Sequence, residues 1–98
     1  MPSYLVESYL ADAPGAVEEA RERARSFAAE STGVRYLRTT FLPGDETILH
    51  VFAAPSREAL VRAAERAGLA DVRVTEAIEN EDDASRLRQT QGSQSEER

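Results

Sequence analysis

Residues 47–56 read Thr47-Ile48-Leu49-His50-Val51-Phe52-Ala53-Ala54-Pro55-Ser56, and this stretch decides the fold. Its first seven positions are rich in β-branched and apolar residues, which favours a β-strand. Pro55 ends the strand and Ser56 is a typical N-cap for a following helix. Side chains of a strand alternate between its two faces, and both faces here carry apolar residues, so we expect both to be at least partly covered. Alternation groups Ile48, His50 and Phe52 on one face and Leu49, Val51 and Ala53 on the other.

Three further strands are predicted around this one. Residues 4–10 and 34–42 alternate in the manner of strands, and residues 72–78 form a short fourth run. Pro43-Gly44-Asp45 is a turn signal, because proline presets φ and glycine accepts a positive φ. The second and third strands should therefore form an antiparallel hairpin.

Two helices are predicted between the strands. The first has Asp12 as its N-cap, Pro14 in its first turn and Gly33 as its stop. The second runs from Arg57 to Ala67. Both carry alanine-rich apolar positions at three- and four-residue spacing, which indicates helices packed by one face against a sheet.

The order β-α-β-β-α-β predicts an α+β fold, a ferredoxin-like sandwich with an antiparallel sheet of spatial order 4-1-3-2. Both helices would lie on one face. The other face would carry an apolar patch larger than a monomer usually exposes. We therefore expect a homodimer of the dimeric α/β-barrel type, with two sheets packed together. The expected patch comprises Leu5, Tyr9, Tyr36, Ile48 and Phe52.

Length and composition predict one domain, residues 1–80, followed by a polar tail, residues 81–98. Of the 98 residues, 41% are hydrophobic and 31% are charged, which is typical of a globular chain. The tail is rich in Gln, Ser and acidic residues. It has too few apolar groups to offset the entropy of ordering it.

Charge and residue usage exclude several classes of function. The net charge of −6 argues against nucleic acid or an anionic membrane as a partner. The absence of cysteine excludes disulfides, thiolate metal sites and cysteine nucleophiles. The N-terminus lacks the pattern of a signal peptide, and no run approaches the roughly 18 apolar residues of a membrane span. We expect a cytoplasmic protein.

The candidate site is centred on His50, the only histidine. On the predicted register Glu7 lies beside it on the open face, with Tyr9, Tyr36 and Arg38 nearby as ligand-binding residues. A carboxylate beside an imidazole fixes its tautomer and raises its basicity, which suits a general base or a metal ligand.

A metal site needs more ligands than His50 and Glu7. Glu76, water or the His50 of a second subunit would have to complete the sphere. Imidazole and carboxylate ligands suit nickel, zinc or iron, and spacing does not choose among these. Glu76 aligns by alternation with the helix side of its strand unless a bulge intervenes.

A structural role is the competing interpretation of these residues. A single histidine on a strand is often a hydrogen-bonded interior or interface residue. Glu7 equally suits an ion pair with Arg38 or with an arginine across the interface.

Four segments carry a family resemblance: Tyr4-Leu5-Val6-Glu7, residues 53–60, residues 64–69 and Val74-Thr75-Glu76-Ala77. They resemble a family of small bacterial ferredoxin-like domains of unknown function, often labelled nickel-binding protein-like, over residues 3–79. The resemblance implies the ferredoxin-like fold, the dimer and a nickel site. Many members of this family have another residue, often cysteine, at the position of His50, and histidine is also a competent nickel ligand.

Three functions remain open at this stage. The first is a homodimer that binds a metal ion or a small molecule through polar groups between the two sheets. The second is a cofactor-independent enzyme with His50 as general base and Tyr36, Tyr9 or Arg38 holding an anionic intermediate. The third is a non-catalytic assembly module.

Overall fold

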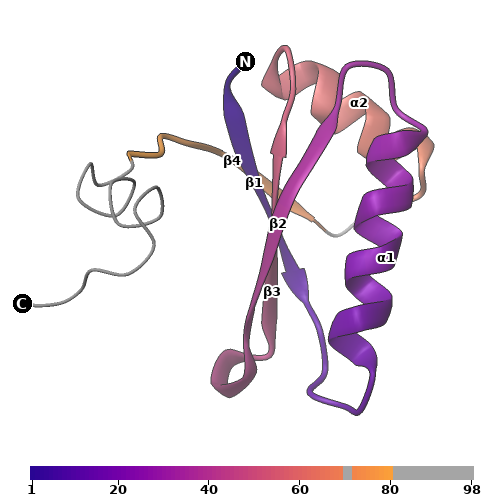
Figure 1. The fold of residues 1–98 in the computed structure, drawn as a ribbon, viewed down its shortest axis with the longest axis vertical. Coiled ribbons are helices and arrows are strands. Elements are labelled where there is room, and N and C mark those ends of the chain that lie inside the picture. The colour runs from indigo at the N-terminus through magenta and orange to yellow at the C-terminus, as the bar shows by residue number, and fades with distance from the viewer. Residues whose placement is uncertain (70–71, 81–98) are drawn as a thin grey trace, which may run out of the picture.

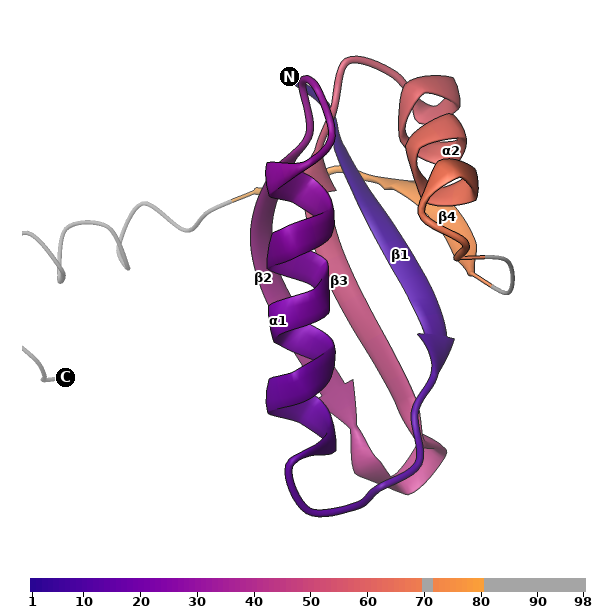
Figure 2. The same ribbon diagram turned by 90° about the vertical axis from the view of Figure 1, so that its right-hand side faces the viewer.

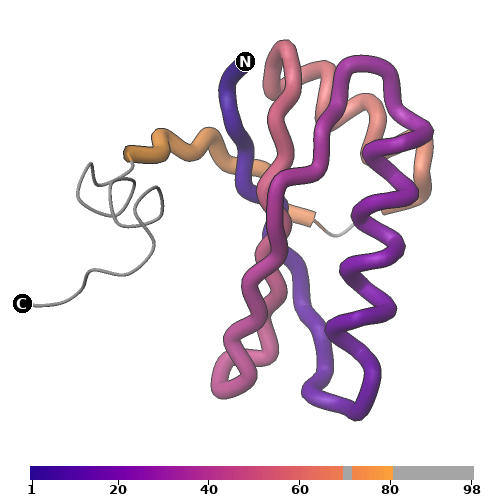
Figure 3. The backbone as a smooth tube through the Cα atoms, in the orientation of Figure 1, coloured from indigo at the N-terminus to yellow at the C-terminus, as the bar shows by residue number. Residues whose placement is uncertain are grey.

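The computed structural model describes residues 1–69 and 72–80 (Figures 1 and 3). Four strands and two helices form an α+β sandwich that is roughly ferredoxin-like, with both helices on one face of the sheet (Figure 1). The predicted tail, residues 81–98, lies outside the described residues. The elements are β1 (Ser3–Tyr9), α1 (Ala16–Ala29), β2 (Arg35–Leu42), the 3-10 turn Pro43–Asp45, β3 (Thr47–Ala53), α2 (Arg57–Arg66) and β4 (Arg73–Ala77).

The sheet is antiparallel throughout, and its strand order is β2-β3-β1-β4. The predicted hairpin joins β2 to β3, which confirms the turn at residues 43–45. Helix α1 lies over β2 and β3, whereas α2 lies over the edge strand β4 (Figure 2). The helix layer is therefore open above β1.

The two helix starts differ in how well the sequence predicted them. Ser56 caps α2 as expected, because its side chain accepts a hydrogen bond of 3.1 Å from the backbone N–H of Ala59. The prediction that Asp12 caps α1 was wrong. The cap position is Gly15, which adopts a left-handed φ of 76°. Asp12 instead donates its backbone N–H to the Glu46 carboxylate at 3.1 Å, which ties the β1–α1 loop to the turn that precedes β3.

The face assignment of β3 was also wrong. His50 is directly opposite Val6, and Phe52 is directly opposite Tyr4. Opposed residues of an antiparallel pair share a face, and Tyr4 and Val6 belong to the core beneath the helices. Ile48, His50 and Phe52 therefore face the helices, not the open side. The Phe52 ring packs edge-on against Phe27 of α1, with 5.2 Å between ring centroids.

A β-bulge in β2 moves further side chains to the helix face. Tyr36 is opposite Phe52, but the next pairs are Arg38 with Val51 and Thr39 with His50, because the register shifts between residues 36 and 38. Strict alternation would put Tyr36 and Thr39 on opposite faces. The extra residue places both of them beneath α1, and it turns Arg38 to the open face.

The open face carries other apolar residues than predicted, because Tyr36, Ile48 and Phe52 are absent from it and Leu49, Val51 and Ala53 of β3 lie there with Leu5. The chain beyond β4 leaves on this side of the sheet (Figures 1 and 2). Glu79 there accepts a hydrogen bond from Arg38, on the strand at the opposite edge. The patch expected to cause dimerisation is thus divided between two faces, and the homodimer stays a prediction.

Candidate functional site

A groove with a volume of about 480 Å³ lies between α1, α2 and the sheet. It runs over the strip of sheet that neither helix covers, and its walls are mainly apolar. Alanines of both helices face this strip, and their small side chains leave the space unfilled. The lining includes Val6, Ala20, Phe27, Phe52, Leu60 and Ala64.

His50 lines the groove and is half-buried. Burial lowers the pKa of its imidazole below the usual 6.5, and the positive charge of Arg23 on α1 lowers it further. Arg23 lines the same groove. The neutral form of the ring therefore predominates at pH 7, with one nitrogen that donates a hydrogen bond and one that accepts.

One ring nitrogen of His50 is held by a short chain of hydroxyl groups. Nδ1 lies 2.8 Å from the Thr39 hydroxyl, which lies 2.6 Å from the Tyr36 hydroxyl. The bulge in β2 makes this chain, since it puts both hydroxyls on the helix face. The other nitrogen, Nε2, has no hydrogen-bond partner among residues 1–69 and 72–80. A polar atom beside an apolar groove is thus left to an incoming molecule or to water.

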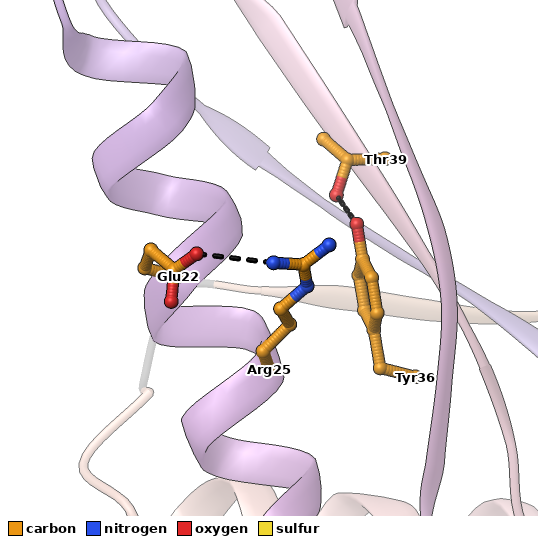
Figure 4. A network of polar contacts seen from close by, with 4 residues as sticks. All are labelled: Glu22, Arg25, Tyr36 and Thr39. Atoms are coloured by element: carbon orange, nitrogen blue, oxygen red, sulfur yellow. Dashed lines mark hydrogen bonds and ion pairs between the residues drawn. The ribbon is translucent and has the colours of Figure 1, made fainter.

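A side chain of α1 contacts Tyr36, the residue of the hydroxyl chain farthest from His50. The Arg25 guanidinium lies over the Tyr36 ring, 5.8 Å from its centroid, and it donates a hydrogen bond of 3.1 Å to Glu22 (Figure 4). Figure 4 shows the Tyr36 hydroxyl directed at Thr39, away from Glu22. Side chains of α1, β2 and β3 together fix the orientation of the imidazole.

The structure does not bring the predicted metal ligands together. Glu7 is opposite Leu49, so it lies on the open face, whereas His50 lies on the helix face. Glu76 is opposite Tyr4 on the edge strand and is exposed, with β1 between it and β3. No group of three or more His, Cys, Asp or Glu side chains within the described part of the chain could hold a metal ion. The described residues of one chain therefore do not group His50, Glu7 and Glu76 as metal ligands, and nickel or zinc binding stays a prediction.

The remaining predicted ligand-binding residues have separate positions. Tyr36 belongs to the hydroxyl chain. Tyr9, at the end of β1, donates its hydroxyl to Glu46 at 3.0 Å, and this carboxylate raises the pKa of the phenol. Arg38 lies on the open face with Glu79, and the guanidinium lowers the pKa of that carboxyl.

Sequence reasoning missed Thr39, Arg23 and the groove itself. Thr39 reaches His50 only through the bulge, and no glycine, proline or other irregular residue marks that bulge between Tyr36 and Arg38. Arg23 is one of several charged residues along its helix, and no sequence pattern distinguishes it from the others. Its place beside His50 depends on which face of β3 lies under α1.

Comparisons with models of known protein families, with curated proteins and with solved structures found no match. The resemblance to nickel-binding protein-like domains therefore stays a prediction from its sequence segments. Neither described helix has the length and apolar character needed to cross a membrane.

The lowered pKa of His50 predicts a pH dependence of stability. The unfolded chain takes up a proton near pH 6.5, whereas the folded chain resists protonation until its lower pKa is reached. His50 therefore contributes fully above about pH 6.5, and this contribution falls as the pH drops towards the folded pKa. Urea unfolding between about pH 7.5 and pH 5 should show a steeper loss of stability for the native chain than for His50→Gln. The same dependence of stability on pH in both proteins would contradict a lowered pKa for His50.

Proposed function

We propose that this protein binds a small, largely apolar molecule in the groove, with a polar group of that molecule against His50. The observation that carries the proposal is that His50 lines an apolar space of about 480 Å³ while its Nε2 has no hydrogen-bond partner in the described part of the chain. Small-molecule sites typically have volumes of about 300–1,000 Å³, mainly apolar walls and a few fixed polar groups.

Preorganisation of His50 supports a binding role. A side chain that only filled space would not need a fixed ring orientation, yet Thr39 holds Nδ1 and Tyr36 holds Thr39. A ligand that meets an already oriented hydrogen-bonding group loses less entropy on binding. The groove thus combines a large apolar contact area with one directed polar contact.

This site differs from the one expected between two sheets. The predicted inter-sheet site required His50 and Glu7 on one open face, and the register of β1 and β3 separates them. The groove is formed by a single chain, so the proposed binding does not depend on a second subunit.

A series of phenylbutyl compounds tests the proposal: 4-phenylbutanol, 4-phenylbutyrate and 4-phenylbutylamine. We expect members of the series to shift the backbone NMR signals of groove residues in the full-length chain, including Ala20, Phe27 and Leu60. Shifts confined to Leu5 and Leu49 on the open face, or no shift with any member at millimolar concentration, would overturn the proposal.

A pair of alanine variants on α1 provides the matched control. Ala20 is 5% exposed and lines the groove, whereas Ala29 is exposed at the end of the same helix and does not line it. Ala20→Leu should fill part of the groove and weaken binding of the phenylbutyl series by about tenfold, or about 1.4 kcal/mol. Ala29→Leu should bind as the native chain does. Equal affinities in the two variants would place the binding elsewhere.

A further inference from the structure

The two hydrogen bonds of the hydroxyl chain can be arranged in three ways, because a hydroxyl donates one proton and can accept two, and a neutral imidazole has one proton. In the first, Tyr36 donates to Thr39, Thr39 donates to Nδ1, and the imidazole proton is on Nε2. In the second, Nδ1–H donates to Thr39, Thr39 donates to Tyr36, and Nε2 is unprotonated. In the third, Tyr36 and Nδ1–H both donate to Thr39, and Nε2 is again unprotonated. The observed distances, 2.6 Å and 2.8 Å, allow all three.

The number of polar groups left without a hydrogen-bond partner favours the first arrangement. In the second, the Tyr36 proton has no acceptor in the described part of the chain, since Thr39 is the only hydrogen-bond partner of that hydroxyl there. In the third, the Thr39 proton has no acceptor among the same residues, since Tyr36 and His50 are the only partners of its hydroxyl there. In the first, both hydroxyl protons and Nδ1 have partners among the described residues, and Nε2–H alone lacks one there. Partly buried polar groups without partners are costly, so the arrangement that leaves fewer of them is preferred.

The chemistry of Tyr36 also argues against the second arrangement. A phenol is more acidic than an aliphatic alcohol, so Tyr36 is the better donor of the pair. The Arg25 guanidinium over the ring stabilises the electron density that a donating hydroxyl pushes into it (Figure 4). An accepting hydroxyl would withdraw density from a ring that faces a cation.

We infer that His50 presents Nε2–H to the groove as a hydrogen-bond donor, and that the groove takes an apolar carboxylate. This deepens the proposed function and rests on it. A donor needs an acceptor on the ligand, and Arg23, which lines the same groove, is the charged group that acts on His50. Three acidic side chains also line the groove: Glu19, which pairs with Arg23, Glu22, which pairs with Arg25, and Glu30. The expected preference for an acid therefore rests on Nε2–H and on the position of Arg23, and not on the net charge of the groove. The same tautomer disfavours a general base at Nε2, which would have to be unprotonated.

The tautomer can be measured directly, because the chain has one histidine. Long-range proton–nitrogen correlation on the ¹⁵N-labelled full-length chain, above pH 7, should show the proton on Nε2 and an unprotonated Nδ1. Thr39→Val removes the donor to Nδ1 and should change this spectrum towards a mixture of tautomers. Thr40→Val, the same change on the opposite face of β2, should leave it unchanged. A proton on Nδ1 in the native chain would overturn the inference.

The phenylbutyl series tests the ligand class separately from the binding itself. We expect 4-phenylbutyrate to bind at least tenfold more tightly than 4-phenylbutylamine, with 4-phenylbutanol between them. His50→Gln keeps an N–H donor and should retain most of this preference, whereas His50→Leu should keep only the smaller part that the charge of Arg23 contributes. Equal affinity of acid and amine in the groove would overturn the inference and leave the proposed function standing. Failure of all three compounds to bind would overturn both.

Discussion

Phe52→Ala should destabilise the protein by about 3–5 kcal/mol, the range typical of a buried phenylalanine replaced by alanine. Phe52 is 2% exposed. Its ring contacts aromatic rings of three elements: Phe27 of α1 at 5.2 Å, Tyr36 of β2 at 6.0 Å and His50 of β3 at 6.2 Å between centroids. Its removal therefore opens a cavity where α1 meets the centre of the sheet. A domain of this size has only about 5–15 kcal/mol of stability, so the variant should be close to unfolding.

Urea denaturation followed by circular dichroism would measure this loss. Phe41→Ala is the matched control, because Phe41 also lies on the helix face but is only partly buried. We expect its midpoint to fall by clearly less than that of Phe52→Ala at a similar m-value. Equal losses would mean that Phe52 is not the packing centre described above.

The sequence predicted the elements of this fold well because each has a local signal. Ser56 marks the start of α2, residues 43–45 mark the hairpin, and the alternating strands are short and rich in β-branched residues. These features act within a few residues of the chain. The fold class followed from their order, and the structure confirms an α+β sandwich of four antiparallel strands and two helices.

The faces of β3 could not be predicted in the same way. Both faces of this strand are apolar, so alternation separates two sets of residues without showing which set the helices cover. Only the pairing with Tyr4 and Val6 on β1 decides it, and that pairing joins residues more than forty positions apart. The face assigned to β1 was correct, and the one assigned to β3 was reversed. Glu7 and His50 were therefore expected together and lie apart.

The candidate site depends on this reversal more than the fold does. With His50 on the helix face, its neighbours are Thr39 and the residues of α1, and its space is a groove within one chain. The bulge in β2 adds a second long-range effect, since it brings Tyr36 and Thr39 to one face. Both effects come from strand pairing, so residue types alone identified His50 but not its surroundings.

Ile48→Ala and Leu49→Ala, two adjacent substitutions of similar size, test the reversed face directly. Ile48 is 2% exposed on the helix face, and its removal should cost about 2–5 kcal/mol. Leu49 is only partly buried on the open face, so its loss should cost clearly less, because water and neighbouring side chains can occupy part of the space.

Which of the two substitutions destabilises the protein more shows which face of β3 lies under the helices. If the original assignment of faces were right, Leu49 would lie under the helices and Leu49→Ala would be the more damaging change. Urea midpoints measured for both variants at one low protein concentration would decide between them. The concentration matters because a dimer through the open face would bury Leu49 as well. If the destabilisation caused by Leu49→Ala grows as the protein is concentrated, a second copy of the chain covers the open face. If the destabilisation caused by Ile48→Ala does not change with concentration, Ile48 lies in the core of a single chain.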